Sequence, residues 1–308
     1  MKKNIHIITG NKGFVGANLS NYISNKNKVI VGVSRNPKKN EIDYSNLNAT
    51  ILNKAKSLIH LAGKAHDLKK TSDDQEYFKI NTELTKTLFN QFLESDCEVF
   101  IYMSSVKAVA DEVEGVLIED VAPNPITVYG KSKLAAEMYI LSKKIPKHKR
   151  VYILRPCMIH GSNNKGNLNL LYNFVSKGIP YPFGAYENKR SFVSVENLCF
   201  IINELIDNDQ IKSGIYNIAD NEALSTNELV STIGLAIDKP TKILKIPKSV
   251  VHFFAKIGNI IPLPINSERL QKLTENYVVS NEKIKKAIGK ELPLSAIEGI
   301  TKTIKSFR

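Results

Sequence analysis

A glycine-rich turn near the N-terminus constrains the fold more than any other feature of this sequence. Gly10, Gly13 and Gly16 follow directly after the β-branched run of residues 4–9, and a helical pattern begins at residue 14. Glycines at such a strand-to-helix turn permit a tight bend, a close approach of the backbone to a diphosphate, and close packing of the helix on the strand. The N–H groups at the helix N-terminus also favour an anion. This stretch therefore predicts a site for a dinucleotide pyrophosphate.

The first half of the chain alternates short apolar strands with helical patterns. The strands are apolar on both faces, which is typical of a parallel sheet covered by helices on two sides. We expect strands at residues 4–9, 28–34, 57–63, 98–105 and 150–156, and helices at residues 14–25, 75–95 and 127–144. The sequence therefore predicts an α/β fold with a doubly wound parallel sheet.

The second half of the chain is less regular and indicates a smaller domain that is interleaved with the first. Helices are expected at residues 167–178 and 226–237 and a strand at residues 214–219, before a polar, lysine-rich end. The longest apolar stretch is residues 249–265, which His252, Lys256 and two prolines interrupt. It is too short to span a membrane and at most lies weakly on a membrane surface.

Cysteine, histidine and lysine usage narrow the class of protein. The three cysteines are odd in number and form no C-x-x-C pair, and the apolar run after the first lysines is too short for an export signal. We therefore expect a cytoplasmic protein. The six histidines lack ligand spacing, so no metal site is expected. The net charge of +13 comes from lysines spread along the chain, without the basic stripe interleaved with aromatics that favours nucleic-acid binding.

Several short motifs occur in an order that resembles one enzyme superfamily. After TGNKGFVG they are HLAG at residues 60–63, Asn81, MSSVKA at 103–108, YGKSK at 129–133, LRP at 154–156 and NKRSFVSVENL at 188–198. Together they resemble the extended short-chain dehydrogenase/reductase superfamily, and within it the NAD-dependent epimerase/dehydratase family of nucleotide-sugar enzymes. The resemblance covers about residues 4–300. It implies a Rossmann domain at residues 1–165, onto which part of 188–220 packs, and a mainly nucleotide-sugar-binding domain at residues 166–308.

Tyr129 and Lys133 are four residues apart on an expected helix, so their side chains share one face. An ammonium beside a phenol favours the phenolate and lowers the tyrosine pKa towards the working pH, as proton exchange with a sugar hydroxyl requires. Ser104 and Ser105 end a strand, where a hydroxyl can reach the same oxygen. The resemblance implies that Tyr129 is the catalytic acid/base, that Lys133 also holds the nicotinamide ribose, and that Ser105 rather than Ser104 hydrogen-bonds the substrate.

The choice of cofactor depends on the end of the second strand. An NAD-binding fold normally has an Asp or Glu there for the ribose 2′-hydroxyl, whereas the 2′-phosphate of NADP is bound by Arg. This chain has Ser34 and Arg35 at that place, two lysines close behind, and no acid before Glu41. We therefore expect NADP(H) in preference to NAD(H).

The resemblance also implies a set of binding residues. Cofactor contacts are expected from Gly10, Lys12, Gly13, Phe14, Val15, Gly16, Ser34, Arg35, Asp43, Leu61, Ala62, Gly63, Asn81, Ser104, Tyr129, Lys133 and Arg155. Substrate contacts are expected from Lys64, Ser105, Asn167, Arg190 and Arg269. Arg190 suits a nucleotide diphosphate because a planar guanidinium binds phosphate oxygens in pairs. Arg269 fits equally well as a solvated helix residue.

Two enzymatic functions stay open. The first, which Arg35 favours, is NADPH-dependent reduction of the C4 ketone of a UDP-4-keto-6-deoxy-N-acetylhexosamine in surface-polysaccharide biosynthesis. The second is a UDP-glucose or UDP-N-acetylglucosamine 4-epimerase with tightly bound NAD. A dehydratase is disfavoured, because Val106 and Lys107 stand where such relatives carry an Asp-Glu pair.

The sequence also bears on non-enzymatic functions and on the oligomeric state. A dinucleotide-sensing or nucleic-acid-binding protein would be expected to lack Tyr129, Lys133 or Ser105, and this chain has all three. Relatives pair through helices at about residues 80–95 and 127–144, so the resemblance implies a homodimer.

Overall fold

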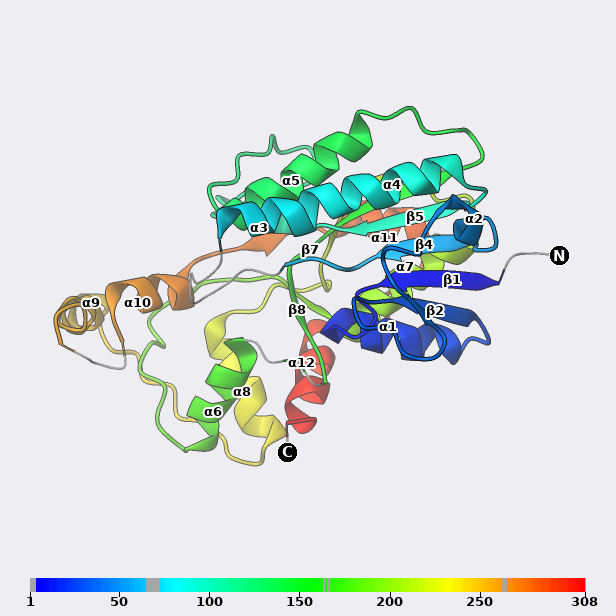
Figure 1. The fold of residues 1–308 in the computed structure, drawn as a ribbon. Coiled ribbons are helices and arrows are strands. Elements are labelled where there is room, and N and C mark those ends of the chain that lie inside the picture. Colours follow the sequence, from blue (N-terminus) through cyan, green and yellow to red (C-terminus); the bar gives the residue numbers. More distant parts are fainter. Residues whose placement is uncertain (1–3, 65–72, 163, 165–166, 262–264, 308) are drawn as a thin grey trace.

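A parallel sheet of seven strands forms the middle layer of the protein (Figure 1). The computed structural model describes residues 4–64, 73–162, 164, 167–261 and 265–307. The strand order is β10-β7-β5-β4-β1-β2-β3, which runs outward in both directions from the neighbouring strands β1 and β4. Such an order places helices on both faces. The predicted doubly wound α/β fold is confirmed.

The strands predicted from apolar runs are all present. The central sheet consists of β1 (Ile5–Thr9), β2 (Val29–Val33), β3 (Glu41–Ile42), β4 (Ser57–His60), β5 (Val99–Met103), β7 (Arg150–Pro156) and β10 (Gly214–Ile218). Two small sheets pair β6 (Val116–Leu117) with β11 (Val278–Val279), and β8 (Met158–His160) with β9 (Phe192–Ser194). The pattern does not predict β3, because two residues are too few to show a period.

Helices cover both faces of the sheet. One face carries α2 (Ala49–Leu52), α3 (Asp74–Phe78), the π-turn η1 (Lys79–Glu83), α4 (Leu84–Glu94) and α5 (Val128–Leu141). The other face carries α1 (Phe14–Ser24), α7 (Val195–Asp207) and α11 (Glu282–Ile288). A short 3-10 turn, η2 (Val106–Ala108), follows β5. The single helix expected at residues 75–95 is thus three segments, because a π-turn interrupts it.

Successive residues of each central strand enter two different cores. Ile8 and Ile59 pair across β1 and β4 and lie in the core beneath α1 and α7. Ile7 and Leu58, one residue earlier in each strand, lie in the core beneath α4 and α5. Both faces of these strands are therefore buried, which explains why their sequences are apolar without alternation.

The C-terminal part forms its own helical layer beside the sheet. Helices α6 (Asn167–Ser176), α8 (Thr226–Ala236) and α12 (Ala296–Lys305) pack around a third core, at the bottom of Figure 1. Helices α9 (Lys248–Ile257) and α10 (Ser267–Thr274) project to the left. The lysine-rich end is therefore more helical than its sequence predicts. Among the described residues, none of the helices has both the length and the apolar character needed to cross a membrane.

Candidate active site

The turn between β1 and α1 is a tight backbone bend. Gly10 has a φ of 69°, a left-handed conformation that glycine adopts without strain. A Cβ on Gly16 would lie 2.2 Å from the Gly10 carbonyl oxygen, so only glycine lets α1 begin this close to the turn. Gly13 is the N-cap of α1, and no side chain caps the N–H groups of the first turn from that position. This end of α1 therefore fits the diphosphate of a dinucleotide.

A cleft of about 250 Å³ lies beyond the carboxyl ends of β4, β5 and β7. Ligands of open parallel sheets bind at this edge. The three predicted catalytic residues all line it. The full lining consists of Leu61, Gly63, Lys64, Met103, Ser104, Ser105, Tyr129, Lys133, Pro156, Cys157 and Ile159.

Tyr129 and Ser105 contact each other in this cleft. Helix α5 brings Tyr129 close to the end of β5 because Gly130 has no side chain: a Cβ there would lie 2.3 Å from the Lys107 carbonyl oxygen. Burial raises the pKa of Tyr129 above its ordinary value, and the hydrogen bond with the Ser105 side chain opposes this rise. Two hydroxyl groups are thus held together where a substrate oxygen can meet both.

Lys133 lies one turn after Tyr129 in α5 and is almost fully buried. Its ammonium donates to the Met103 carbonyl oxygen over 2.8 Å, and burial lowers the pKa of Lys133 to about 8. A Cβ on Gly63 would lie 3.0 Å from this nitrogen, so the chain after β4 passes close to it. The pKa of Tyr129 is not lowered as expected, because burial raises it and the Ser105 hydrogen bond opposes that rise only in part.

Ser104 belongs to a buried polar network behind the cleft. Its hydroxyl donates to the Glu137 carboxylate, which also receives two N–H groups of Arg155. Ser105, the serine that the resemblance favours, is the one that contacts Tyr129. Glu137 thus engages Nε and Nη2 of Arg155, whereas Nη1 is buried without a hydrogen-bond partner, and contact of Arg155 with a cofactor stays a prediction.

The π-turn η1 places Asn81 behind the end of β4. The side-chain oxygen Oδ1 of Asn81 accepts from the Lys64 backbone N–H over 2.7 Å, and the Asn81 side-chain Nδ2 donates to the Ser132 hydroxyl over 3.0 Å. Asn81 is fully buried and therefore ties the chain after β4 to α5. Lys64 reaches the cleft, and its ammonium pairs with Glu76 over 2.5 Å. Single π-turns often occur at functional sites, and this one supports the cleft wall.

An acidic residue lies at the end of β2 in the folded chain, although the sequence shows none there. Parallel pairing of β2 with β3 sets Glu41 opposite Gly32. The Glu41 carboxylate accepts from the Ser34 hydroxyl over 3.1 Å and from the Asn11 amide over 2.9 Å. Glu41 is the first acid after Ser34 in the sequence, and the pairing of β3 with β2 is what brings its carboxylate to the Ser34 hydroxyl.

The Glu41 carboxylate is nevertheless fully engaged. Its Oε2 also receives the Lys38 N–H over 2.8 Å and pairs with the Lys12 ammonium over 2.9 Å. These hydrogen bonds lower the pKa of Glu41 to about 2. A carboxylate has about four acceptor positions, so little capacity is left for a ribose hydroxyl. Arg35 is exposed beside this cluster.

The other predicted cofactor residues lie near the glycine-rich turn or the end of β4. Phe14, Val15 and Leu61 are partly buried against the core beneath α1. The Ala62 N–H donates to the Thr9 hydroxyl over 3.2 Å. Asp43 instead directly follows β3, is half-buried, and accepts from the Ser45 N–H and hydroxyl. Their roles toward a cofactor stay predictions.

The three remaining substrate residues lie in the C-terminal part. Asn167 begins α6. Arg190 donates to the Lys272 carbonyl oxygen over 2.7 Å and pairs with Glu275 over 3.1 Å, at the end of α10. Arg269 is exposed on α10. Neither arginine is among the residues that line the cleft, so their contact with a substrate stays a prediction.

Sequence reasoning misses several residues of this region, among them Glu137, Cys157 and Ile159. Glu137 lies four residues after Lys133, so the spacing that links Tyr129 to Lys133 extends one turn further and could have identified it. Cys157 and Ile159 follow the end of β7 and line the cleft. The rule that ligands bind beyond strand ends could have included both.

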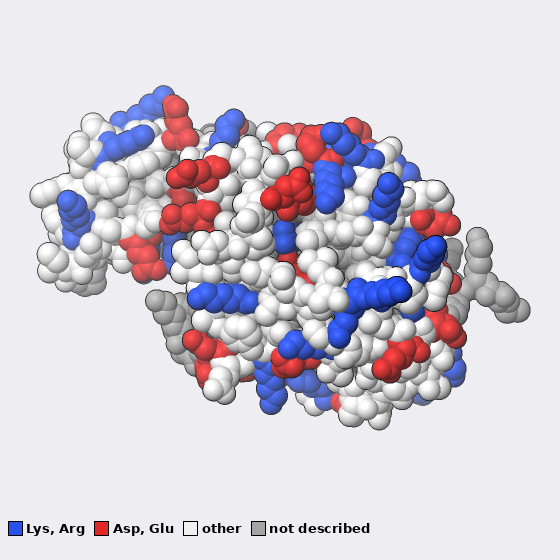
Figure 2. All heavy atoms as spheres, turned by 90° about the horizontal axis from the view of Figure 1, so that it is seen from above, with Lys and Arg blue, Asp and Glu red and all other residues white. Residues whose placement is uncertain are grey.

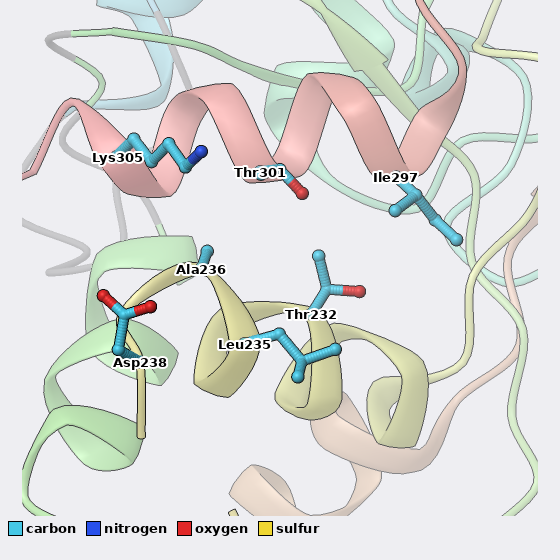
Figure 3. A pocket seen from close by; sticks show the side chains of 7 residues that line it. All are labelled: Thr232, Leu235, Ala236, Asp238, Ile297, Thr301 and Lys305. Carbon is cyan, nitrogen blue, oxygen red and sulfur yellow. The ribbon is translucent and has the colours of Figure 1, made fainter. Parts of the chain in front are cut away.

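A second cavity contains no predicted site residue. A cavity of about 360 Å³ lies between α8 and α12, lined by Thr232, Leu235, Ala236, Asp238, Ile297, Thr301 and Lys305 (Figure 3). Figure 2 shows Lys and Arg side chains intermixed with Asp and Glu on one face. Within the described part of the chain, no group of His, Cys, Asp and Glu side chains is arranged to hold a metal ion.

This chain is similar in sequence and in structure to known nucleotide-sugar enzymes. The NAD dependent epimerase/dehydratase family matches residues 6–219. The whole chain is 31% identical to UDP-glucose 4-epimerase from Vibrio cholerae, over 96% of that protein. The fold is similar to UDP-N-acetylglucosamine 4-epimerase from Bacillus cereus, with a TM-score of 0.77, 21% identity and 98% coverage of both chains. It is also similar to MoeE5 in complex with UDP-glucose and NAD, with a TM-score of 0.75, 21% identity and 98% coverage of both chains. The chain therefore belongs to the NAD dependent epimerase/dehydratase family, as an NAD(P)-dependent nucleotide-sugar epimerase or reductase.

Proposed function

We propose that this enzyme reduces the C4 ketone of a UDP-4-keto-6-deoxy-N-acetylhexosamine with NADPH. The observation that carries this proposal is the cluster at the end of β2. Glu41 has four donors on its carboxylate, including the Lys12 ammonium, while the Arg35 guanidinium is exposed. A 2′-phosphate can bind Arg35 and the remaining N–H of Lys12, whereas a 2′-hydroxyl would have to displace a donor from Glu41.

Three residues of the cleft have a defined role in this reaction. Tyr129 gives its proton to the C4 oxygen, because its hydroxyl is paired with Ser105 and faces the cleft. Ser105 donates a hydrogen bond to the same oxygen as negative charge develops on it. Lys133 holds the ribose hydroxyls from behind. When bound, the dihydronicotinamide supplies the hydride to C4.

A 4-epimerase with tightly bound NAD is the second candidate. The relative from Vibrio cholerae, similar over the whole chain, is a UDP-glucose 4-epimerase. The same cleft serves this reaction, because Tyr129 can remove a proton from a C4 hydroxyl as well as return one. Glu41 would then bind the ribose after one of its donors turns away.

A pair of assays separates the two candidates. The full chain is purified, its bound nucleotide is released and identified, and single-turnover NADPH oxidation is followed with a UDP-4-keto-6-deoxy-hexosamine. Exchangeable NADPH and its oxidation by the keto sugar support the reductase. The epimerase replaces the reductase as the conclusion if NAD copurifies in stoichiometric amount, if UDP-glucose and UDP-galactose interconvert, and if the keto sugar oxidises no NADPH.

The proposal also includes the compartment in which the enzyme works and the UDP-sugar that it binds. Cys97, Cys157 and Cys199 are buried and are not joined by disulfides, in keeping with the reducing cytoplasm in which we place the protein. UDP-sugar binding is supported by the structural similarity to MoeE5, which was solved with UDP-glucose.

A further inference from the structure

Helix α9 has two apolar faces, and only one of them is covered. Val251 and Ala255 are buried against Tyr186 and Leu270, which fixes α9 on α10. On the other side Phe253 is 61% exposed, and Phe254 and Val250 are exposed as well. Large exposed side chains of this kind are unusual when they stand together on a short helix.

The apolar surface continues past the end of α9. Ile260 is 87% exposed and Ile261 is also exposed, just after the helix. We call the five side chains of Val250, Phe253, Phe254, Ile260 and Ile261 the α9 surface. In Figure 1 helices α9 and α10 lie at the extreme left, away from the sheet and from the helices that cover it. The α9 surface is therefore open to a large, flat partner.

Lysine is the only charged residue type in α9 and in the chain just before and after it, while the neighbouring α10 carries the exposed Glu268 beside Arg269 and Lys272. Residues 239–261 contain five lysines and no Asp or Glu. Lys242, Lys245, Lys248 and Lys256 are exposed. A basic, amphipathic helix with Phe on its apolar face has the composition of a helix that lies in a membrane interface.

We propose that the α9 surface docks the enzyme on an anionic membrane. Phe253, Phe254 and Ile260 enter the boundary between headgroups and acyl chains, and the surrounding lysines bind anionic headgroups. The helix lies on the bilayer and does not cross it, since it has only ten residues. A second copy of the chain is a poorer partner, because a two-fold contact would bring two lysine-rich surfaces of like charge together.

Vesicle sedimentation with the full chain tests this docking. The vesicles contain equal parts of phosphatidylglycerol and phosphatidylcholine, with pure phosphatidylcholine as the neutral comparison. We expect binding to the anionic vesicles that falls at high salt. The double variant Phe253→Ser/Phe254→Ser should bind about tenfold or more weakly. Lys245→Glu/Lys248→Glu should lose binding to a similar extent, and only on anionic vesicles.

Leu235→Ser/Ile297→Ser is the matched control. These two side chains are also large, apolar and exposed, but they flank the cavity between α8 and α12 in Figure 3. This control should bind vesicles like the unmodified protein. Equal binding by the phenylalanine variant, or no binding to anionic vesicles at low salt, overturns the proposal. Light scattering that shows a smaller particle only for the phenylalanine variant also overturns it, in favour of a contact between copies.

Discussion

Arg155 and Glu137 form an ion pair that is almost completely buried behind the catalytic cleft. The Arg155 Nε lies 3.1 Å from Oε1 of Glu137, and its Nη2 lies 2.5 Å from Oε2. Glu137 also accepts from Ser104, whose neighbour Ser105 contacts Tyr129. The pair therefore joins α5 to the ends of β5 and β7, and it holds the cleft wall that carries the reacting hydroxyls.

Removing one partner of this pair should destabilise the protein strongly. Arg155→Met leaves the Glu137 carboxylate buried without its counter-ion, which typically costs about 3–5 kcal/mol. Glu137→Met/Arg155→Met should recover most of that loss, because neither charge stays buried. Urea unfolding measures both free energies. The control Lys86→Met breaks an exposed pair with Glu83 and should cost less than about 1 kcal/mol. Equal losses of stability in Arg155→Met and Lys86→Met would contradict the importance of the buried pair.

Tyr129→Phe should slow turnover by about 10² to 10⁴ while both ligands still bind. The variant loses only the hydroxyl that exchanges the proton, so cofactor titration should be unchanged. Tyr139→Phe is the control, since Tyr139 lies on the same helix and bonds Asn90 away from the cleft. Single-turnover NADPH oxidation gives the rates. If Tyr129→Phe is as fast as the unmodified enzyme, Tyr129 is not the acid.

Ser105→Ala should cost less in rate than Tyr129→Phe, because only one hydrogen bond to a partly charged oxygen is lost. The Ser105 hydroxyl also opposes the rise in the Tyr129 pKa, so the pH profile should shift to higher pH in this variant. Rates measured across the alkaline range check both effects. An unshifted pH profile would show that the Ser105 hydroxyl does not affect the pKa of Tyr129 during the reaction.

Lys133 should make stability depend on pH in the alkaline range. Its pKa falls from 10.5 to about 8 on folding. Below about pH 8 Lys133 is protonated in both the folded and the unfolded chain, so the cost of burying its ammonium lowers the unfolding free energy in full. Between about pH 8 and 10.5 the unfolded chain binds more protons, so the unfolding free energy rises with pH, by up to roughly 3 kcal/mol. Lys133→Met should lack this rise in urea unfolding; parallel curves for both proteins would refute the assignment.

Arg35→Asp should weaken NADPH binding and shift the preference towards NADH. The new carboxylate repels a 2′-phosphate and can accept a hydrogen bond from a 2′-hydroxyl. Lys54→Asp makes a similar change of charge at an exposed position before β4 and should leave the preference unchanged. Fluorescence titration with each cofactor gives the two affinities. Equal NADH and NADPH affinities in the unmodified protein would rule out the proposed role of Arg35.

Met138→Glu should convert a dimer into monomers. Met138 is 59% exposed on α5, and Leu141 is exposed one turn later, on one of the two helices of the predicted dimer contact. Leu170→Glu, at an exposed position on α6, is the control. Light scattering at micromolar concentration reports the mass. A monomeric unmodified protein would exclude this interface.

The sequence by itself determines the features that depend on neighbours in the chain. The turn at Gly10 is predictable because three glycines follow a β-branched run, and its positive φ is what such a turn needs. Tyr129 and Lys133 share a helix face because they are four residues apart. The parallel sheet is predictable because its strands are apolar on both faces.

Only the tertiary structure decides the features that join distant parts of the chain. Glu41 reaches Ser34 because β3 pairs with β2, and two residues of strand leave no periodic signal. Arg155 meets Glu137 because β7 and α5 pack together, and no spacing between residues 137 and 155 encodes that contact. Burial likewise sets the pKa of Lys133, since it depends on the water removed by every element around the side chain.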